Sequence, residues 1–167
     1  ANETTLKLNQ VTANQAQKIA VVGGGPAGLA FATAAASRGH NVTLFEKDQA
    51  IGGQFNMAKK VPGKEEFFET LRYFGKQLEL TGVTTKLNTV ATAENLTGFD
   101  SIVLATGVVP RDIKLPVKDT SKVNVVSYLD VLKHGAPVGQ RVAVVGAGGI
   151  GYDIAEYLTH QGAAITG

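Results

Sequence analysis

The chain of 167 residues contains no cysteine and no tryptophan, and its three histidines, His40, His134 and His160, stand far apart. Without cysteine these residues can form no disulfide, use no catalytic thiol and hold no thiolate-bound metal or iron–sulfur cluster. Lysine and arginine together number 16 against 14 acidic residues, and no run of basic residues forms a patch. This charge pattern argues against nucleic acid as a partner.

Long hydrophobic runs are also nearly absent. Residues 19–36 carry no charge, but they include four glycines and Pro26, a composition that predicts a strand, a turn and a buried helix instead of a membrane span. The first eighteen residues are polar and lack the apolar stretch of a signal peptide. We therefore expect a cytoplasmic location and no membrane partner.

Short apolar strands alternate with helices along the chain. We expect strands at 18–22, 41–46, 83–88, 101–107 and 141–145, and helices at 26–38, 64–82 and 127–135. The run at 101–107 is almost wholly apolar, which is typical of a buried strand. This alternation predicts the α/β class, with a Rossmann-like parallel sheet and helices on both of its faces.

Two segments, GGGPAG at 23–28 and GAGGIG at 146–151, fit the pattern G-x-G-x-x-G, and each follows an expected strand. In the first, Gly23 permits a tight turn, Gly25 lets the backbone approach a pyrophosphate and Gly28 lets the helix pack close to the sheet. The following helix N-terminus offers free N–H groups to phosphate. The pattern predicts a dinucleotide site at each loop.

The two loops belong to an internal repeat. A shift of 123 positions places AVVG at 20–23 on the same letters at 143–146, Gly39 on Gly162, and VT at 42–43 on IT at 165–166. The second module therefore stops as its second strand begins. We expect the chain to be part of a longer protein that has two dinucleotide domains.

Glu46 stands eighteen residues after Gly28, at the end of the second expected strand. A carboxylate there would accept hydrogen bonds from a ribose hydroxyl and disfavour a 2′-phosphate, which predicts FAD or NAD at the first loop. Because this end of the strand should be exposed, we expect Glu46 to contribute little to the fold. The matching position of the second loop, 169, lies beyond the sequence.

Two further segments could border the first site. The glycines of IGGQ at 51–54 would let backbone amides approach the pyrophosphate or the flavin, although a flexible turn would also use them. ATG at 105–107 ends a strand at the carboxyl edge of the sheet, where ligands bind in open α/β folds. The alternative there is a strand that simply ends in a glycine turn.

The stretches GGGPAGLA, FEKDQAIGGQF, ATGVVPR and VGAGGIGYDIAEYL resemble, in order and spacing, the flavoproteins with two dinucleotide-binding domains. These include disulfide reductases and the glutamate synthase small subunit. IGGQFNMAKKVPGKEEFFETLRYF, SYLDVL and PVGQRVAVVGAGGIGYDIAEYL are more similar to the C-terminal half of bacterial NADPH-dependent 2,4-dienoyl-CoA reductases. Those enzymes are related to trimethylamine dehydrogenase. The resemblance covers about residues 18–162.

This resemblance implies that NADPH reduces FAD here and that electrons then pass through an iron–sulfur cluster to FMN in an upstream barrel domain of the same parent chain. It assigns FAD contacts to Gly23, Gly25, Pro26, Ala27, Gly28, Glu46, Lys47, Gly53, Gln54, Ala105, Thr106 and Gly107, and NADP contacts to Gly146, Gly148, Gly149, Ile150 and Gly151. No catalytic residue and no metal ligand is expected among these residues.

The expected organisation has three parts. Residues 1–17 form a linker or extended arm, 18–135 an FAD-binding domain without its C-terminal return strand, and 136–167 the truncated start of an NAD(P)H-binding domain. We expect this chain alone to be inactive toward a dienoyl-CoA. Two alternatives stay open, a glutamate-synthase-like or other flavoprotein electron donor and a non-catalytic nucleotide-binding domain.

Overall fold

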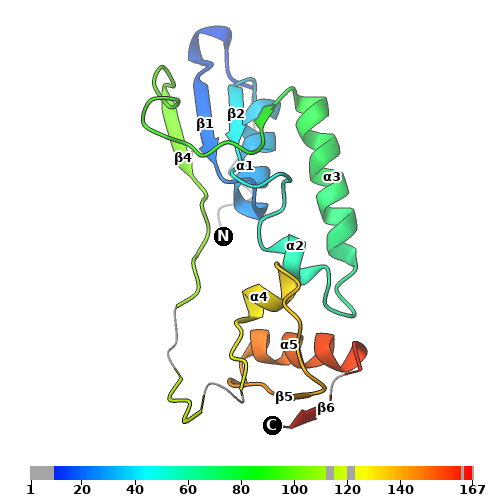
Figure 1. The fold of residues 1–167 in the computed structure, drawn as a ribbon. Helices are drawn as coiled ribbons and strands as arrows, with labels where there is room; N and C mark the ends of the chain where they lie inside the picture. Colours follow the sequence, from blue (N-terminus) through cyan, green and yellow to red (C-terminus); the bar gives the residue numbers. More distant parts are fainter. Residues whose placement is uncertain (1–9, 112–114, 120–122, 163, 167) are drawn as a thin grey trace. The chain divides into compact units, whose positions relative to one another are not determined.

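A computed structural model describes residues 10–111, 115–119, 123–162 and 164–166 (Figure 1). The chain divides into two compact units. The first comprises Ala1–Phe55 and Glu69–Val108, and the second comprises Asn56–Phe68 and Val109–Gly167. Within the described part of the chain, no helix has the length and apolar character needed to span a bilayer.

The first unit is built on a parallel sheet with the strand order β3-β2-β1-β4. Its strands are β1 (Lys18–Val22), β2 (Asn41–Phe45), β3 (Thr84–Lys86) and β4 (Ser101–Leu104). In the central pairing, Ile19 of β1 lies opposite Val42 of β2 and Ser101 of β4. The predicted α/β class, with a Rossmann-like parallel sheet, is confirmed.

Helices α1 (Pro26–Ser37) and α3 (Glu66–Thr81) supply the other half of the core of this unit. Every second side chain of β1 and β2 points to the same face of the sheet. On that face these side chains pack against residues of α1 that are three positions apart and against one residue of α3. The buried cluster includes Ile19, Val21, Val42, Leu44, Leu29, Ala32, Ala35 and Leu78. The apolar residues of the central strands therefore hold the carboxyl ends of β1 and β2 in a fixed place.

Strand β4 differs from its prediction. It ends at Leu104 instead of residue 107, and Ile102 and Leu104 are 49% and 74% exposed. Only one face of β4, the last strand in the described sheet, is covered: Val103 packs against the core cluster, whereas Ile102 and Leu104 point to the opposite face. An apolar run alone cannot distinguish a strand buried on both faces from an edge strand.

The second unit contains a two-stranded parallel sheet of β5 (Arg141–Ala143) and β6 (Ala164–Thr166), with helices α4 (Tyr128–Leu132) and α5 (Gly149–His160). Val131 and Leu132 of α4 are buried against Ile154 and Leu158 of α5. For this reason the second unit begins at Val109 in this part of the chain, whereas the expected FAD-binding domain extends to residue 135. Which nucleotide each unit binds stays a prediction.

Helix α4 begins with a capping box. The Ser127 hydroxyl accepts a hydrogen bond from the N–H of Asp130, and the Asp130 carboxylate accepts one from the N–H of Ser127. The Ser127 hydroxyl also donates to this carboxylate, and these bonds lower the pKa of Asp130 below its ordinary value. The box explains why this short helix starts where it does.

The ends of several elements differ by a few residues from those expected. The expected helix 64–82 is observed at 66–81, the helix 127–135 at 128–132, the strand 83–88 at 84–86 and the strand 141–145 at 141–143. Two short elements were not predicted, the 3-10 helix η1 (Ala13–Gln15) and helix α2 (Phe55–Ala58). Both are too short to leave a periodic apolar pattern.

The internal repeat is confirmed down to the strand register. Lys18 pairs with Asn41 in the first unit, and Arg141 pairs with Ala164 in the second, with both partners moved by 123 positions. The bounds of α1 and α5 differ by the same number. Each unit therefore contains the same strand, loop, helix and strand.

Candidate functional site

The first glycine loop follows β1 and leads into α1. Gly23 has φ +110°, and a β-carbon there would lie 2.3 Å from the carbonyl oxygen of Ala105. A β-carbon on Gly28 would lie 1.9 Å from the carbonyl oxygen of Gly23. Gly25 has an ordinary φ of −78°, and a β-carbon there would meet nothing within 4 Å. Gly23 and Gly28 are therefore required by the fold, whereas the space beside Gly25 is open.

The start of α1 is suited to an anion. Gly25 is the N-cap, so it has no side chain that could cap the helix, and Pro26 occupies the first turn. Proline has no N–H to leave unpaired, whereas the N–H groups of Ala27 and Gly28 point out of the helix end. A helix of 12 residues also presents the positive end of its dipole here. This arrangement can bind a phosphate.

The second loop repeats this geometry. Gly146 has φ +119°, Gly148 is the N-cap of α5 with φ −85°, and a β-carbon on Gly151 would lie 2.0 Å from the carbonyl oxygen of Gly146. The space beside Gly148 and Gly149 is open, and Ile150 is half exposed. The predicted residues of the second loop thus come together within the second unit.

Glu46 follows β2 directly and is buried, with 6% of its surface exposed. Its Oε2 accepts a hydrogen bond of 2.6 Å from the N–H of Gly24, and its Oε1 accepts one of 2.8 Å from the N–H of Asp48. Our expectation that Glu46 contributes little to the fold is therefore wrong. The carboxylate braces the first loop, and because a carboxylate has about four acceptor positions, it can still accept further hydrogen bonds.

The segment 51–54 crosses the first loop. The N–H of Gly52 donates to the carbonyl oxygen of Gly24 over 2.7 Å. Gly53 has φ +50°, and a β-carbon there would lie 3.1 Å from the Cα of Gly25. Gln54 is exposed beside this turn. The turn is thus held against the loop by a hydrogen bond and by a close backbone contact.

The segment 105–107 borders the same loop from the other side. The N–H of Ala105 donates to the carbonyl oxygen of Val22 over 2.8 Å, which continues the pairing of β4 with β1. Thr106 and Gly107 are exposed, and Gly107 has φ +73°. Lys47, next to Glu46, is also exposed. The predicted residues of the first site therefore gather at the carboxyl ends of β1, β2 and β4.

Sequence reasoning gave no role to Gly24, and it did not show the hydrogen bond from the N–H of Gly52 to the carbonyl oxygen of Gly24. Gly24 donates to Glu46, and a β-carbon on it would lie 3.0 Å from Oε2, so a side chain there would press on the carboxylate. Gly52 holds the crossing turn. The motif G-x-G-x-x-G leaves position 24 open, and only the fold shows that Glu46 lies beneath it.

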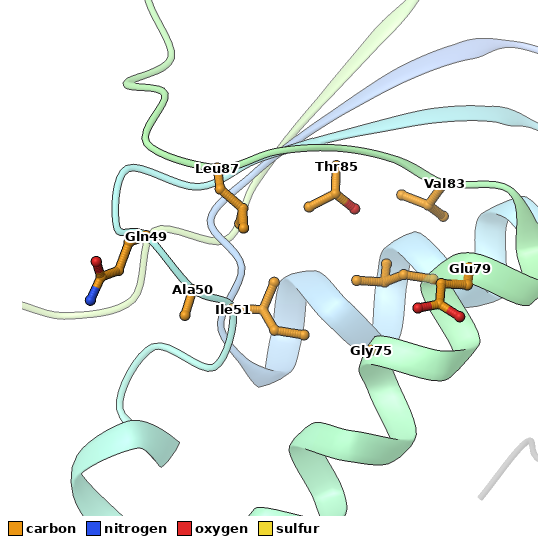
Figure 2. A pocket seen from close by; sticks show the side chains of 9 residues that line it. Gln49, Ala50, Ile51, Gly75, Glu79, Val83, Thr85 and Leu87 are labelled. Atoms are coloured by element: carbon orange, nitrogen blue, oxygen red, sulfur yellow. The ribbon is translucent and has the colours of Figure 1, made fainter.

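A groove of about 400 Å³ lies elsewhere in the first unit, between α3, β3 and the turn at 49–51. Figure 2 shows Ile51 projecting into the space beside α3, with Leu87 and Val83 above it. The residues that line it are Gln49, Ala50, Ile51, Gly75, Leu78, Glu79, Val83, Thr85 and Leu87. All of these differ from the predicted cofactor contacts, so the groove is separate from the glycine-loop site.

The glycine loops and their repeated geometry agree with a comparison to known families. The family of pyridine nucleotide-disulphide oxidoreductases matches residues 17–166. The chain belongs to this family. Members of the pyridine nucleotide-disulphide oxidoreductase family are flavoproteins that bind FAD and a nicotinamide nucleotide. The resemblance to flavoprotein oxidoreductases is thereby confirmed.

Individual relatives are much longer than this member of the family. The chain is 35% identical over 162 residues to a metal reductase of Desulforamulus reducens and 37% identical over 161 residues to a cinnamate reductase of Clostridium sporogenes. These matches cover 93% and 92% of the chain but 24% and 23% of the relatives. The chain thus spans about a quarter of their length.

A solved structure supports the same relationship. The structure of 2-naphthoyl-CoA reductase in complex with 2-naphthoyl-CoA matches with a TM-score of 0.86 and 35% sequence identity. It covers 95% of this chain and 24% of that one. The fold of most of this chain is therefore similar to that of a structurally characterised reductase.

Proposed function

We propose that this chain binds FAD at the loop 23–28 and a nicotinamide nucleotide at the loop 146–151, as part of an NADPH-dependent oxidoreductase. The observation that carries the FAD assignment is the buried carboxylate of Glu46, braced beneath the first loop by two backbone N–H groups. When bound, the flavin supplies the two-electron redox chemistry that side chains lack. The role of the protein is to hold and orient the flavin.

The residues of the first site divide this task. The N–H groups of Ala27 and Gly28 bind the pyrophosphate at the start of α1, which Gly25 lets approach. Glu46 accepts hydrogen bonds from the adenosine ribose and repels a 2′-phosphate, so that this site selects FAD over NADP. The remaining residues that would border the cofactor are Lys47, Gly53, Gln54, Ala105, Thr106 and Gly107.

The second site has the same loop but a different surrounding. Around Gly146, Gly148 and Gly149, no heavy atom lies within 4 Å of a β-carbon position among the described residues, whereas a side chain, a crossing turn and a neighbouring strand brace the first loop. Gly149, Ile150 and Gly151 supply the N–H groups of the first turn of α5. These N–H groups would hold the pyrophosphate of the nicotinamide nucleotide.

For the parent protein we propose reduction of a 2,4-dienoyl-CoA or a related enoate. The support is the resemblance described above, together with relatives that are named for reducing cinnamate and 2-naphthoyl-CoA. In such a reaction the nicotinamide nucleotide and FAD would supply two electrons, which together with two protons reduce one double bond, and this chain would hold the two cofactors at the loops 146–151 and 23–28. The FMN, the iron–sulfur cluster and the barrel would lie in the remaining part of the parent chain.

Titration of the purified chain with FAD and with FMN tests the first assignment. FMN lacks the adenosine and the pyrophosphate link, so it forgoes the hydrogen bonds to Glu46. We expect FAD to bind about tenfold more tightly or better, since one charge-assisted hydrogen bond alone contributes about that factor. Flavin fluorescence gives both dissociation constants. Equal affinity for FAD and FMN would contradict the role of Glu46.

A further inference from the structure

Residues Asn56–Phe68 interrupt the first unit in sequence but belong to the second unit in space. We call them the inserted segment. Met57 packs against the buried cluster of α4 and α5, and the Nζ of Lys60 donates to the carbonyl oxygen of Leu132 over 2.5 Å. Val61 is buried. The inserted segment is therefore an integral part of the second unit.

Lys64 of the inserted segment forms an ion pair with Asp153 of α5. Its Nζ lies 2.7 Å from both carboxylate oxygens, and the side chains of Lys64 and Asp153 are 39% and 29% exposed. The two residues are 89 positions apart in the sequence. A second pair, Lys76–Glu79, lies within α3, is more exposed, and joins residues three positions apart.

The position of Asp153 gives this pair a consequence for the second loop. Asp153 comes five residues after Gly148, the N-cap of α5. At about 1.5 Å per residue, its backbone lies about 7.5 Å along the axis from the end that would receive a pyrophosphate. This is about one Debye length at physiological ionic strength, so an unpaired carboxylate there would repel the phosphates.

We propose that Lys64 is a positioning residue for the nicotinamide nucleotide: by pairing with Asp153, it neutralises a carboxylate that would otherwise oppose binding at 146–151. The inference rests on the proposed function of the second loop. A lysine encoded between parts of the first unit would thus set the affinity of the second site for its nucleotide.

The test is the dissociation constant of NADPH, measured by nucleotide fluorescence on the full chain. Lys64→Met should weaken binding about three- to tenfold at low ionic strength, and the difference should shrink as salt is added. Asp153→Asn should bind at least as tightly as the wild type, and the double variant should regain wild-type affinity. Lys76→Met, which breaks the exposed pair on α3, is the matched control and should leave the dissociation constant of NADPH unchanged.

These variants distinguish an electrostatic effect of the pair Lys64–Asp153 on nucleotide binding from a purely structural role of the pair. If the pair served only to hold α5 in place, Asp153→Asn would weaken NADPH binding as much as Lys64→Met does, and that result would overturn the inference. Binding by Lys64→Met equal to the wild type would overturn it as well. A wild-type chain that binds no NADPH would instead refute the proposed function of the second loop, and the inference with it.

Discussion

Replacement of Gly25 by alanine is expected to weaken FAD binding about tenfold or more while leaving the thermal midpoint unchanged. The backbone of Gly25 has φ −78°, which alanine adopts without strain, and a β-carbon there would meet nothing within 4 Å. The new methyl group would instead occupy the space that the pyrophosphate needs. Flavin fluorescence titration and thermal unfolding of the same samples measure the two effects.

Two other glycines of the repeat serve as controls for this prediction. Gly148→Ala alters the equivalent position of the second loop, where φ is −85°, and should leave the affinity for FAD unchanged. Gly28→Ala would force a methyl group to within 1.9 Å of the Gly23 carbonyl oxygen and should destabilise the fold by about 2–3 kcal/mol. Wild-type affinity for FAD in the Gly25→Ala variant would show that no pyrophosphate lies there.

Replacement of Glu46 by glutamine is expected to lower both stability and FAD affinity. The carboxylate accepts hydrogen bonds from two backbone N–H groups, one on each oxygen. A glutamine side chain has only one oxygen, so its NH₂ group would face an N–H donor. The buried donor left without an acceptor should cost about 1–3 kcal/mol of unfolding free energy, and the thermal midpoint should fall by about 2–12 °C.

The FAD affinity of the Glu46→Gln variant should fall about fivefold to tenfold, because the ribose would lose charge-assisted hydrogen bonds. Glu79→Gln is the matched control, since the Glu79 side chain is 70% exposed and pairs with Lys76 on the same helix. It should change the unfolding free energy by about 0.5 kcal/mol or less. A Glu46→Gln variant as stable as the wild type would contradict the bracing role of this carboxylate.

The glycine loops could be predicted from the sequence because the first and last glycine of each motif have a backbone reason to be there. Gly23 and Gly146 both have positive φ, and Gly28 and Gly151 both sit too close to a carbonyl oxygen to carry a β-carbon. Such requirements leave a fixed spacing in the chain. The same spacing at two places, 123 positions apart, also predicted the internal repeat, and the strand register agrees with it.

Features that depend on contacts between residues far apart in the sequence could not be predicted from local patterns. The buried carboxylate of Glu46 accepts a hydrogen bond from the N–H of Gly24, 22 positions away, and Lys64 forms an ion pair with Asp153, 89 positions away. Helix α4 joins the second unit because Leu132 packs against α5. In each case the local pattern predicts the element or the residue type, but only the fold shows what it contacts.

The location of bound FAD can be measured directly, and we expect it at the loop 23–28. At 17.4 kDa, the chain suits amide NMR spectroscopy with assigned glycine signals. Addition of FAD should shift the amide signals of Gly23, Gly25 and Gly28, together with that of Gly53, and should leave those of Gly146 and Gly151 in place. Shifts confined to Gly146 and Gly151, with the signals of Gly23, Gly25 and Gly28 unchanged, would show that FAD does not bind at the first loop.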